Sequence, residues 1–229
     1  MSKSAPTVVA RSAIRTTFAG TAAACALAVV PAAHADIIVD DFSSGDFTET
    51  ISAGLTSAEY TGTMIGGVRF AGQFVNANPF DNVLTTSVSG GLYEFAAGDG
   101  VVAGGLLGYG AGSSAGALNL DVSGETAFEI QFGDALATSF TSIVSFGSSA
   151  GSAGVEATFE AGSTSYVLDL SELDGLDLTD IDLISVGPNP GFGEPGLNFS
   201  IDRIAFVPAP GAIALFGLAG LAGARRRRG

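Results

Sequence analysis

The sequence predicts an all-β protein in which residues 36–207 form one antiparallel β-sandwich of the jelly-roll type. Apolar and polar residues alternate in short runs such as AFEIQF at 127–132, which places one face of each strand on the core and the other in water. Turn signals rich in Gly, Pro, Asn and Asp separate these runs, as at 66–67, 98–100 and 188–191. No long stretch of the segment has a helical period, and short strands between such turns are typical of sandwiches and barrels.

The same alternation defines further expected strands. In VEATFE at 155–160 and SYVLDL at 165–170 the apolar residues share one face. The run VRFAGQF at 68–74 places Val68, Phe70 and Phe74 together on the face expected to meet the core. The chain has 33 glycines, but the runs between them are rich in Phe, Val, Ile and Leu, which disordered segments lack.

The first 35 residues have the organisation of a secretory signal peptide. Basic residues near the start precede the apolar run FAGTAAACALAVV at 18–30. The sequence PAAHA then places Ala33 and Ala35 at the small-residue positions of a cleavage site, directly before Asp36. We therefore predict export through the secretion machinery and a mature chain that begins at Asp36.

The expected sandwich is strongly acidic. It holds all 23 acidic residues of the chain but only Arg69 and Arg203 as basic residues, which gives a net charge of about −21. Such a surface repels nucleic-acid phosphates, so nucleic-acid binding is excluded as a function class. The segment contains no His, Lys or Cys, so we predict no catalytic residues of those types and expect each arginine to neutralise neighbouring acids.

The carboxyl end carries a second targeting segment. Pro208 and Pro210 form a hinge before the uncharged residues 211–224, which predict a membrane helix of about 21 Å. This length is short against a bilayer core of about 30 Å, so the segment predicts either a transient anchor or a plain weak one. Four arginines follow, and the positive-inside rule keeps them in the cytoplasm: Arg225, Arg226, Arg227 and Arg228.

The order of these parts, Val207-Pro208-x-Pro210, a short apolar helix and an arginine cluster, resembles the PEP-CTERM sorting signal of bacterial surface proteins. The family's usual Glu between the prolines is Ala209 here. The resemblance implies that an exosortase, an integral-membrane transpeptidase, recognises the tail at 208–229 and removes it. It also implies a transient stay in the inner membrane, followed by a final location at the cell surface or in the extracellular matrix.

The two ends of the expected sandwich, DIIVDDFSSGDF at 36–47 and NFSIDRIAF at 198–206, resemble the terminal strands of galactose-binding-like and carbohydrate-binding-module jelly rolls. The resemblance implies that the first and last strands are neighbours and that Asp40, Asp41 and Asp202 hold a structural calcium ion. Calcium also suits the oxygen ligands of so acidic a domain. No other cofactor is predicted. The acidic stretch at 174–182 lacks the closing Glu of an EF-hand loop and is interpreted as a solvated connection.

Three functions remain open from the sequence. The leading one is a non-catalytic surface or matrix protein whose acidic sandwich supports adhesion or hydration. The second is a calcium-dependent carbohydrate-binding module with polysaccharide as its partner, although the chain has no Trp, the commonest platform for sugar rings. The third is a glycosidase that uses paired carboxylates, since these are the catalytic groups that the composition leaves.

Overall fold

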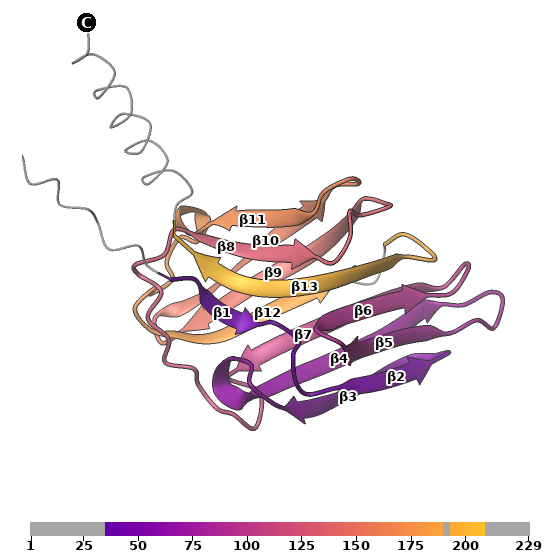
Figure 1. Cartoon of the computed structure of the whole chain (residues 1–229), viewed down its shortest axis with the longest axis horizontal. Coiled ribbons are helices and arrows are strands. Elements are labelled where there is room, and N and C mark those ends of the chain that lie inside the picture. Colours follow the sequence, from indigo (N-terminus) through magenta and orange to yellow (C-terminus); the bar gives the residue numbers. More distant parts are fainter. Residues whose placement is uncertain (1–34, 190–192, 209–229) are drawn as a thin grey trace, which may run out of the picture. The chain divides into compact units, whose positions relative to one another are not determined.

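The computed structural model describes residues 35–189 and 193–208, and in this part of the chain the regular structure is almost entirely β (Figure 1). Within it, no helix is long and apolar enough to cross a bilayer. The elements follow in this order: β1 (Ile37–Asp40), β2 (Phe47–Ile51), β3 (Gly54–Thr61), the 3-10 helix η1 (Ile65–Gly67), β4 (Val68–Ala77), β5 (Leu84–Ser89), β6 (Leu92–Ala97), β7 (Val102–Gly110), β8 (Ala127–Phe132), β9 (Phe140–Ser148), β10 (Gly151–Phe159), β11 (Ser165–Asp169), the 3-10 helix η2 (Leu170–Glu172), β12 (Ile181–Pro188) and β13 (Asn198–Val207).

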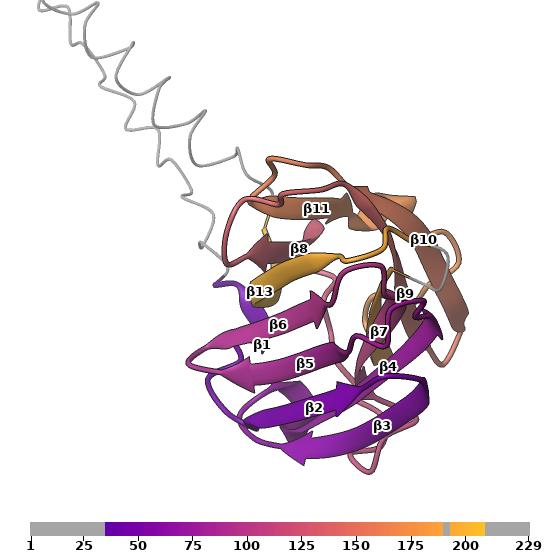
Figure 2. The ribbon, with the colours of Figure 1, turned by 90° about the vertical axis from the view of Figure 1, so that its right-hand side faces the viewer.

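The strands form two antiparallel sheets that pack face to face (Figure 1 and Figure 2). The seven-stranded sheet has the order β11-β8-β13-β6-β5-β2, with β1 also paired to β13. The six-stranded sheet has the order β10-β9-β12-β7-β4-β3. The predicted all-β antiparallel sandwich is therefore confirmed.

The first and last strands are neighbours, as the sequence predicted. Ile37 lies opposite Phe206 and Ile38 opposite Ala205, and Figure 1 shows β1 alongside β13. The register shifts between Ile38 and Asp40. Such an irregularity re-aims a side chain, and here the Asp40 side chain is buried inside the sandwich.

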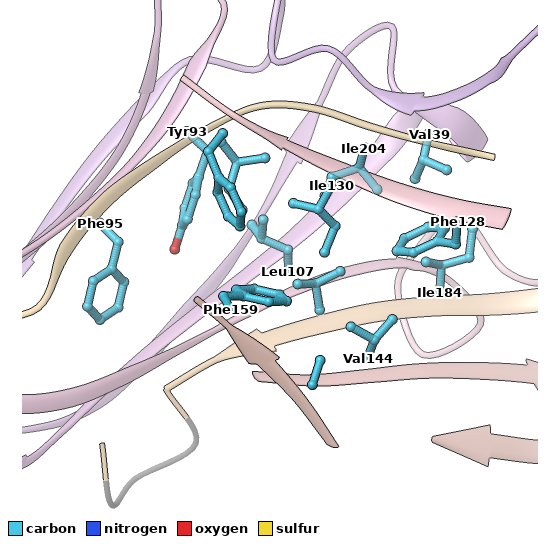
Figure 3. Packing of buried hydrophobic residues seen from close by; sticks show 14 of the residues in the cluster. Val39, Tyr93, Phe95, Leu107, Phe128, Ile130, Val144, Phe159, Ile184 and Ile204 are labelled. Atoms are coloured by element: carbon cyan, nitrogen blue, oxygen red, sulfur yellow. The ribbon is translucent and has the colours of Figure 1, made fainter. Parts of the chain in front are cut away.

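The core lies between the two sheets and is built from the alternating apolar residues of both. Figure 3 shows Phe128 and Ile130 of β8, Leu107 of β7 and Val144 of β9 in one buried cluster, and all four are fully buried. The Phe128 ring meets the Phe146 ring edge-on, with centroids 5.0 Å apart. This interdigitation of the two inner faces is what fixes the alternating pattern in a sandwich.

Strand β4 faces the opposite way from the prediction. Arg69 and Gln73 point into the sandwich and are 0% and 3% exposed, whereas Phe70 and Phe74 are only partly buried and line a groove on the outer surface. The reason is that both polar side chains have partners inside the sandwich. Arg69 binds Asp40, and Thr86 donates a hydrogen bond to Gln73 at 3.0 Å. The expectation that Phe70 and Phe74 meet the core is therefore wrong, whereas Val68, at the start of the strand, is buried as expected.

The two predicted targeting segments fall largely outside the described residues. Val207 is the last residue of β13 and lies opposite Ala127, while the cleavage-site residue Ala33, the helix at 211–224 and the Arg225–Arg228 cluster lie beyond the described ranges. Their roles remain predictions.

Candidate functional site

A buried ion pair joins the first strand to the six-stranded sheet. The Arg69 guanidinium donates to both carboxylate oxygens of Asp40, at 2.6 Å from Nε and 2.9 Å from the second terminal nitrogen. Tyr109 on β7 donates its hydroxyl to Asp40 at 2.8 Å, and the Phe42 amide donates to the same carboxylate at 2.8 Å. Arg69 also donates to the carbonyl oxygens of Ser44 and Gly45, each at 3.1 Å. The charges are thus fully partnered, as buried charges must be.

The surroundings keep both charges in place. Burial by itself would lower the pKa of Arg69, but the hydrogen bond and the negative charge of Asp40 outweigh it, so the pKa is raised. The Arg69 guanidinium carbon also lies 5.0 Å from the centre of the Phe42 ring, which adds a cation–π contact. The pair is a structural element rather than a ligand clamp, in agreement with the expected role of Arg69.

The predicted calcium ligands are not brought together. Asp40 accepts hydrogen bonds from Arg69 and Tyr109. The Asp41 carboxylate accepts from the amide and hydroxyl of Ser43, and Asp202 is exposed on β13. In residues 35–189 and 193–208 there is no group of three acidic, His or Cys side chains that could hold a metal ion. Asp40 is removed from the predicted set on physical grounds, because a carboxylate that accepts from a guanidinium, a phenol and an amide has no free oxygen for calcium.

At Asp40, Asp41 and Asp202 we therefore expect calcium to act only by screening charge. The melting temperature in calcium chloride should equal that in sodium chloride at matched ionic strength, since both reduce the self-repulsion of the acidic surface. Thermal melting with calcium, with chelator and with matched sodium chloride measures this. A melting temperature that is higher in calcium alone, and that Asp202→Ala lowers, would restore the calcium site.

Several exposed acids form local turns. Asp121, Asp169 and Asp177 each accept a hydrogen bond from the backbone amide two residues later, at 2.8–3.0 Å. Hydrogen bonds from Ser123, Ser171 and Thr179 lower the pKa of these three carboxyls. The recurring Asp-x-Ser/Thr pattern was the signal in the sequence for these turns. It agrees with the interpretation of 174–182 as a solvated connection.

Arg203 neutralises acids at the surface, as expected. It donates to Asp36 at 2.8 Å and to Glu129 at 3.3 Å. Asp36, the residue predicted to follow signal cleavage, is therefore tied to the last strand. Because the Arg203 side chain is 24% exposed, its ion pairs are expected to stabilise the fold by only about 0–1 kcal/mol.

The four tyrosines of the chain give a prediction about alkaline pH. Burial is the main cause that raises the pKa of each: Tyr60, Tyr93, Tyr109 and Tyr166. For Tyr60 the pKa rises to about 12, first through burial and then through its hydrogen bond to Glu49. The neutral phenols favour the folded state, so this stability is complete below pH 10 and is lost as pH rises towards 12.

We therefore expect tyrosinate absorbance to appear well above pH 10 in the native protein and near pH 10 in denaturant. A spectrophotometric titration of both states measures this. A native titration that matches the denatured one would contradict the buried positions of Tyr93 and Tyr109 and the partly buried positions of Tyr60 and Tyr166.

The first groove lies on the outer face of the seven-stranded sheet. It has a volume of about 380 Å³. Its floor comes from β5, β6 and β13, and its wall from the loop after β8. The lining offers hydroxyl, amide and carboxylate groups beside small apolar ones. The lining residues that carry polar side chains are Thr85, Ser87, Glu94, Asp134, Asn198 and Ser200.

Local contacts hold this groove in shape. Ser87 donates to Glu94 at 3.2 Å across β5 and β6. The Asn198 side chain donates to the Gly196 carbonyl at 2.7 Å. The wall can approach β13 because Gly133 has no side chain: a Cβ there would lie 2.5 Å from the Ser200 hydroxyl. The Gly133 amide donates to the Ser200 carbonyl at 3.0 Å and fixes this approach.

The second groove lies on the outer face of the six-stranded sheet and differs in chemistry. Its volume is about 470 Å³, and a smaller hollow of about 240 Å³ shares Phe70, Leu106 and Ser185 with it. Of the described residues that line the two hollows, none is charged. Leu55, Leu106 and Ile143 on this face are 76%, 39% and 43% exposed. We call this surface, the two hollows and these side chains, the neutral face.

Comparison with known proteins adds only a likeness of architecture. No protein-family model matches the chain, and no curated protein matches it. A family 11 carbohydrate-binding module from Clostridium thermocellum, solved with a β-1,3-1,4-mixed-linked tetrasaccharide, is similar with a TM-score of 0.39 and 12% identity, over 76% of this chain and 96% of that one. The solution structure of CtCBM11 is similar with a TM-score of 0.38 and 14% identity, over 79% of this chain and 99% of that one. The structure of PfGH50B is similar with a TM-score of 0.39 and 10% identity, over 61% of this chain and 22% of that one. Likeness at this level extends to the β-sandwich and supports no statement about ligands.

Proposed function

We propose that this protein is an exported, non-catalytic surface or matrix protein whose sandwich binds polysaccharide in the groove of the seven-stranded sheet. The observation that carries the proposal is the mixed lining of that groove, in which hydroxyl, amide and carboxylate groups from three strands and one loop face a common space. Sugar hydroxyls both donate and accept hydrogen bonds, so a ligand of this kind satisfies all three groups. Apolar lining atoms such as those of Leu136 suit the C–H faces of a sugar ring.

The charge of the domain narrows the ligand class. A net charge of about −21 repels acidic polysaccharides, so we expect the ligand to be a neutral glycan. Glu94 and Asp134 in the groove act as hydrogen-bond acceptors for sugar hydroxyls in this proposal.

Binding of the full chain to a panel of neutral and acidic polysaccharides tests the proposal. We expect a neutral glycan to be retained, and we expect Glu94→Gln and Asn198→Ala each to weaken binding about tenfold. Glu94→Gln replaces a charged acceptor by a neutral one, and Asn198→Ala removes one hydrogen bond. Glu156→Gln, an equivalent change on the other sheet, serves as the control and should bind normally. A wild-type chain that binds no glycan would contradict the proposal, and release of new reducing ends would identify the glycosidase instead.

The delivery part of the proposal rests on the two ends of the sequence. Export by the signal at 1–35, transient anchoring by 211–224 and removal of the tail near Pro208 and Pro210 would place the sandwich outside the cell. Deleting Arg225–Arg228 is expected to increase the fraction that is secreted or mislocalised. The intact mass of the surface form measures processing, and a surface form that still carries residues 211–229 would favour the plain anchor.

A further inference from the structure

The neutral face is an unusual surface for so acidic a domain. The inner strands β4, β7, β12 and β9 present large apolar side chains beside glycines, and the ring of Phe74 lies where a side chain on Gly104 would stand. Serine hydroxyls from β9 and β12 are the polar side chains at its centre. Contiguous exposed apolar surface of this kind marks an interaction site.

The edges of the same sheet carry the charges. Glu59 on β3 lies opposite Phe70, and Glu156 on β10 lies opposite Ile143, and both are exposed. Charged residues on edge strands disfavour the addition of another strand at the edge. The apolar centre between them leaves the face, rather than the edge, as the contact surface.

We propose that two copies of this chain associate through their neutral faces. The charge of the domain limits how two copies can meet: their acidic surfaces repel each other, and the neutral face is where they approach without that penalty. The contact is isologous, so each face supplies the apolar partner that the other requires.

The size of the face fits this occupant. The four inner strands that carry most of it, β4, β7, β12 and β9, contain 8 to 10 residues each. With strands about 4.8 Å apart and about 3.3 Å per residue, these four strands cover roughly 550–600 Å². Two such faces together bury roughly 1,100–1,200 Å², which is above the total of about 1,000 Å² that a specific interface requires.

Cysteine crosslinking of the full chain tests the proposal, since Cys25 is the single cysteine of the sequence. In a Cys25→Ala background, Ser185→Cys places a thiol near the centre of the neutral face, where a residue meets its own copy across a two-fold axis. Thr85→Cys places the control thiol in the groove of the other sheet. We expect a covalent dimer from Ser185→Cys and none from Thr85→Cys.

Charge substitutions complete the test. Adding Leu106→Asp or Ile143→Glu to Ser185→Cys is expected to reduce the crosslinked fraction about tenfold, because each buries an unpaired charge in the contact. Val167→Asp, at an apolar residue that is 51% exposed on the seven-stranded sheet, should leave it unchanged. Sodium chloride should increase the crosslinked fraction by screening the acidic surfaces. Equal crosslinking at Ser185→Cys and Thr85→Cys, or crosslinking that neither charge reduces, would overturn the proposal without touching glycan binding in the other groove.

Discussion

Replacing Arg69 with methionine is expected to lower the free energy of unfolding by about 3–5 kcal/mol, because the change leaves the Asp40 carboxylate buried without its cation. Asp40 is 1% exposed and Arg69 is 0% exposed, so water cannot take the place of the lost partner. Tyr109 and the Phe42 amide still donate to Asp40, but neither carries a positive charge. Denaturant unfolding followed by circular dichroism measures the change.

Arg203→Met is the matched control, because it removes the other arginine of the sandwich from a partly exposed pair. It should cost about 0–1 kcal/mol. The double change Asp40→Leu with Arg69→Met should cost less than the sum of the single changes, since it removes both buried charges together. If Arg69→Met and Arg203→Met destabilised the protein equally, the buried pair would have no special role in stability.

The sandwich was predictable because its strands obey a period of two over most of their length. In AFEIQF, Phe128, Ile130 and Phe132 are buried and Glu129 and Gln131 are not, which is the pattern that a sheet with one wet face imposes. The pairing of β1 with β13 was also predictable, although from a resemblance of the end sequences rather than from the period.

The orientation of β4 was not predictable from its own residues. Its pattern offers Phe70 and Phe74 on one face and Arg69 and Gln73 on the other, and the apolar set looks like the core face. The buried partner of Arg69 is Asp40, 29 residues earlier, and Asp40 reaches the interior through an irregular step in β1. A tertiary ion pair therefore decided the register, which local alternation cannot reveal.

The two grooves were missed for a related reason. Glu94, Asp134 and Asn198 come from three separate parts of the chain and meet only through the strand order β13-β6-β5 and the loop after β8. On the other sheet, the signal in the sequence was the glycine-rich strand β7, because glycines there leave room for the rings of β4. From the sequence alone, glycines of this kind cannot be told apart from turn residues.

Gly104→Ala is expected to lower the free energy of unfolding by about 1–3 kcal/mol through overpacking. A Cβ at this position would contact the Asn189 carbonyl oxygen and would lie 2.5 Å from the end of the Phe74 ring. Asn189 cannot easily retreat, since its amide donates to the Thr141 carbonyl at 2.9 Å and its side chain donates to the Ala103 carbonyl at 2.5 Å. The ring of Phe74 must therefore move, or the β12 end must shift away from β7.

Gly108→Ala supplies the control on the same strand and the same face. The nearest atom to its added Cβ is the Phe70 Cβ at 3.6 Å, which is ordinary van der Waals contact. Its backbone is not in the left-handed region, so replacing glycine should be neutral or should stabilise the fold by about 0.4–1 kcal/mol through the unfolded chain. Thermal melting of the two variants at one protein concentration separates them. Equal melting temperatures would mean that the end of β12 can move away from β7 at little cost, and that Asn189 does not hold it in place.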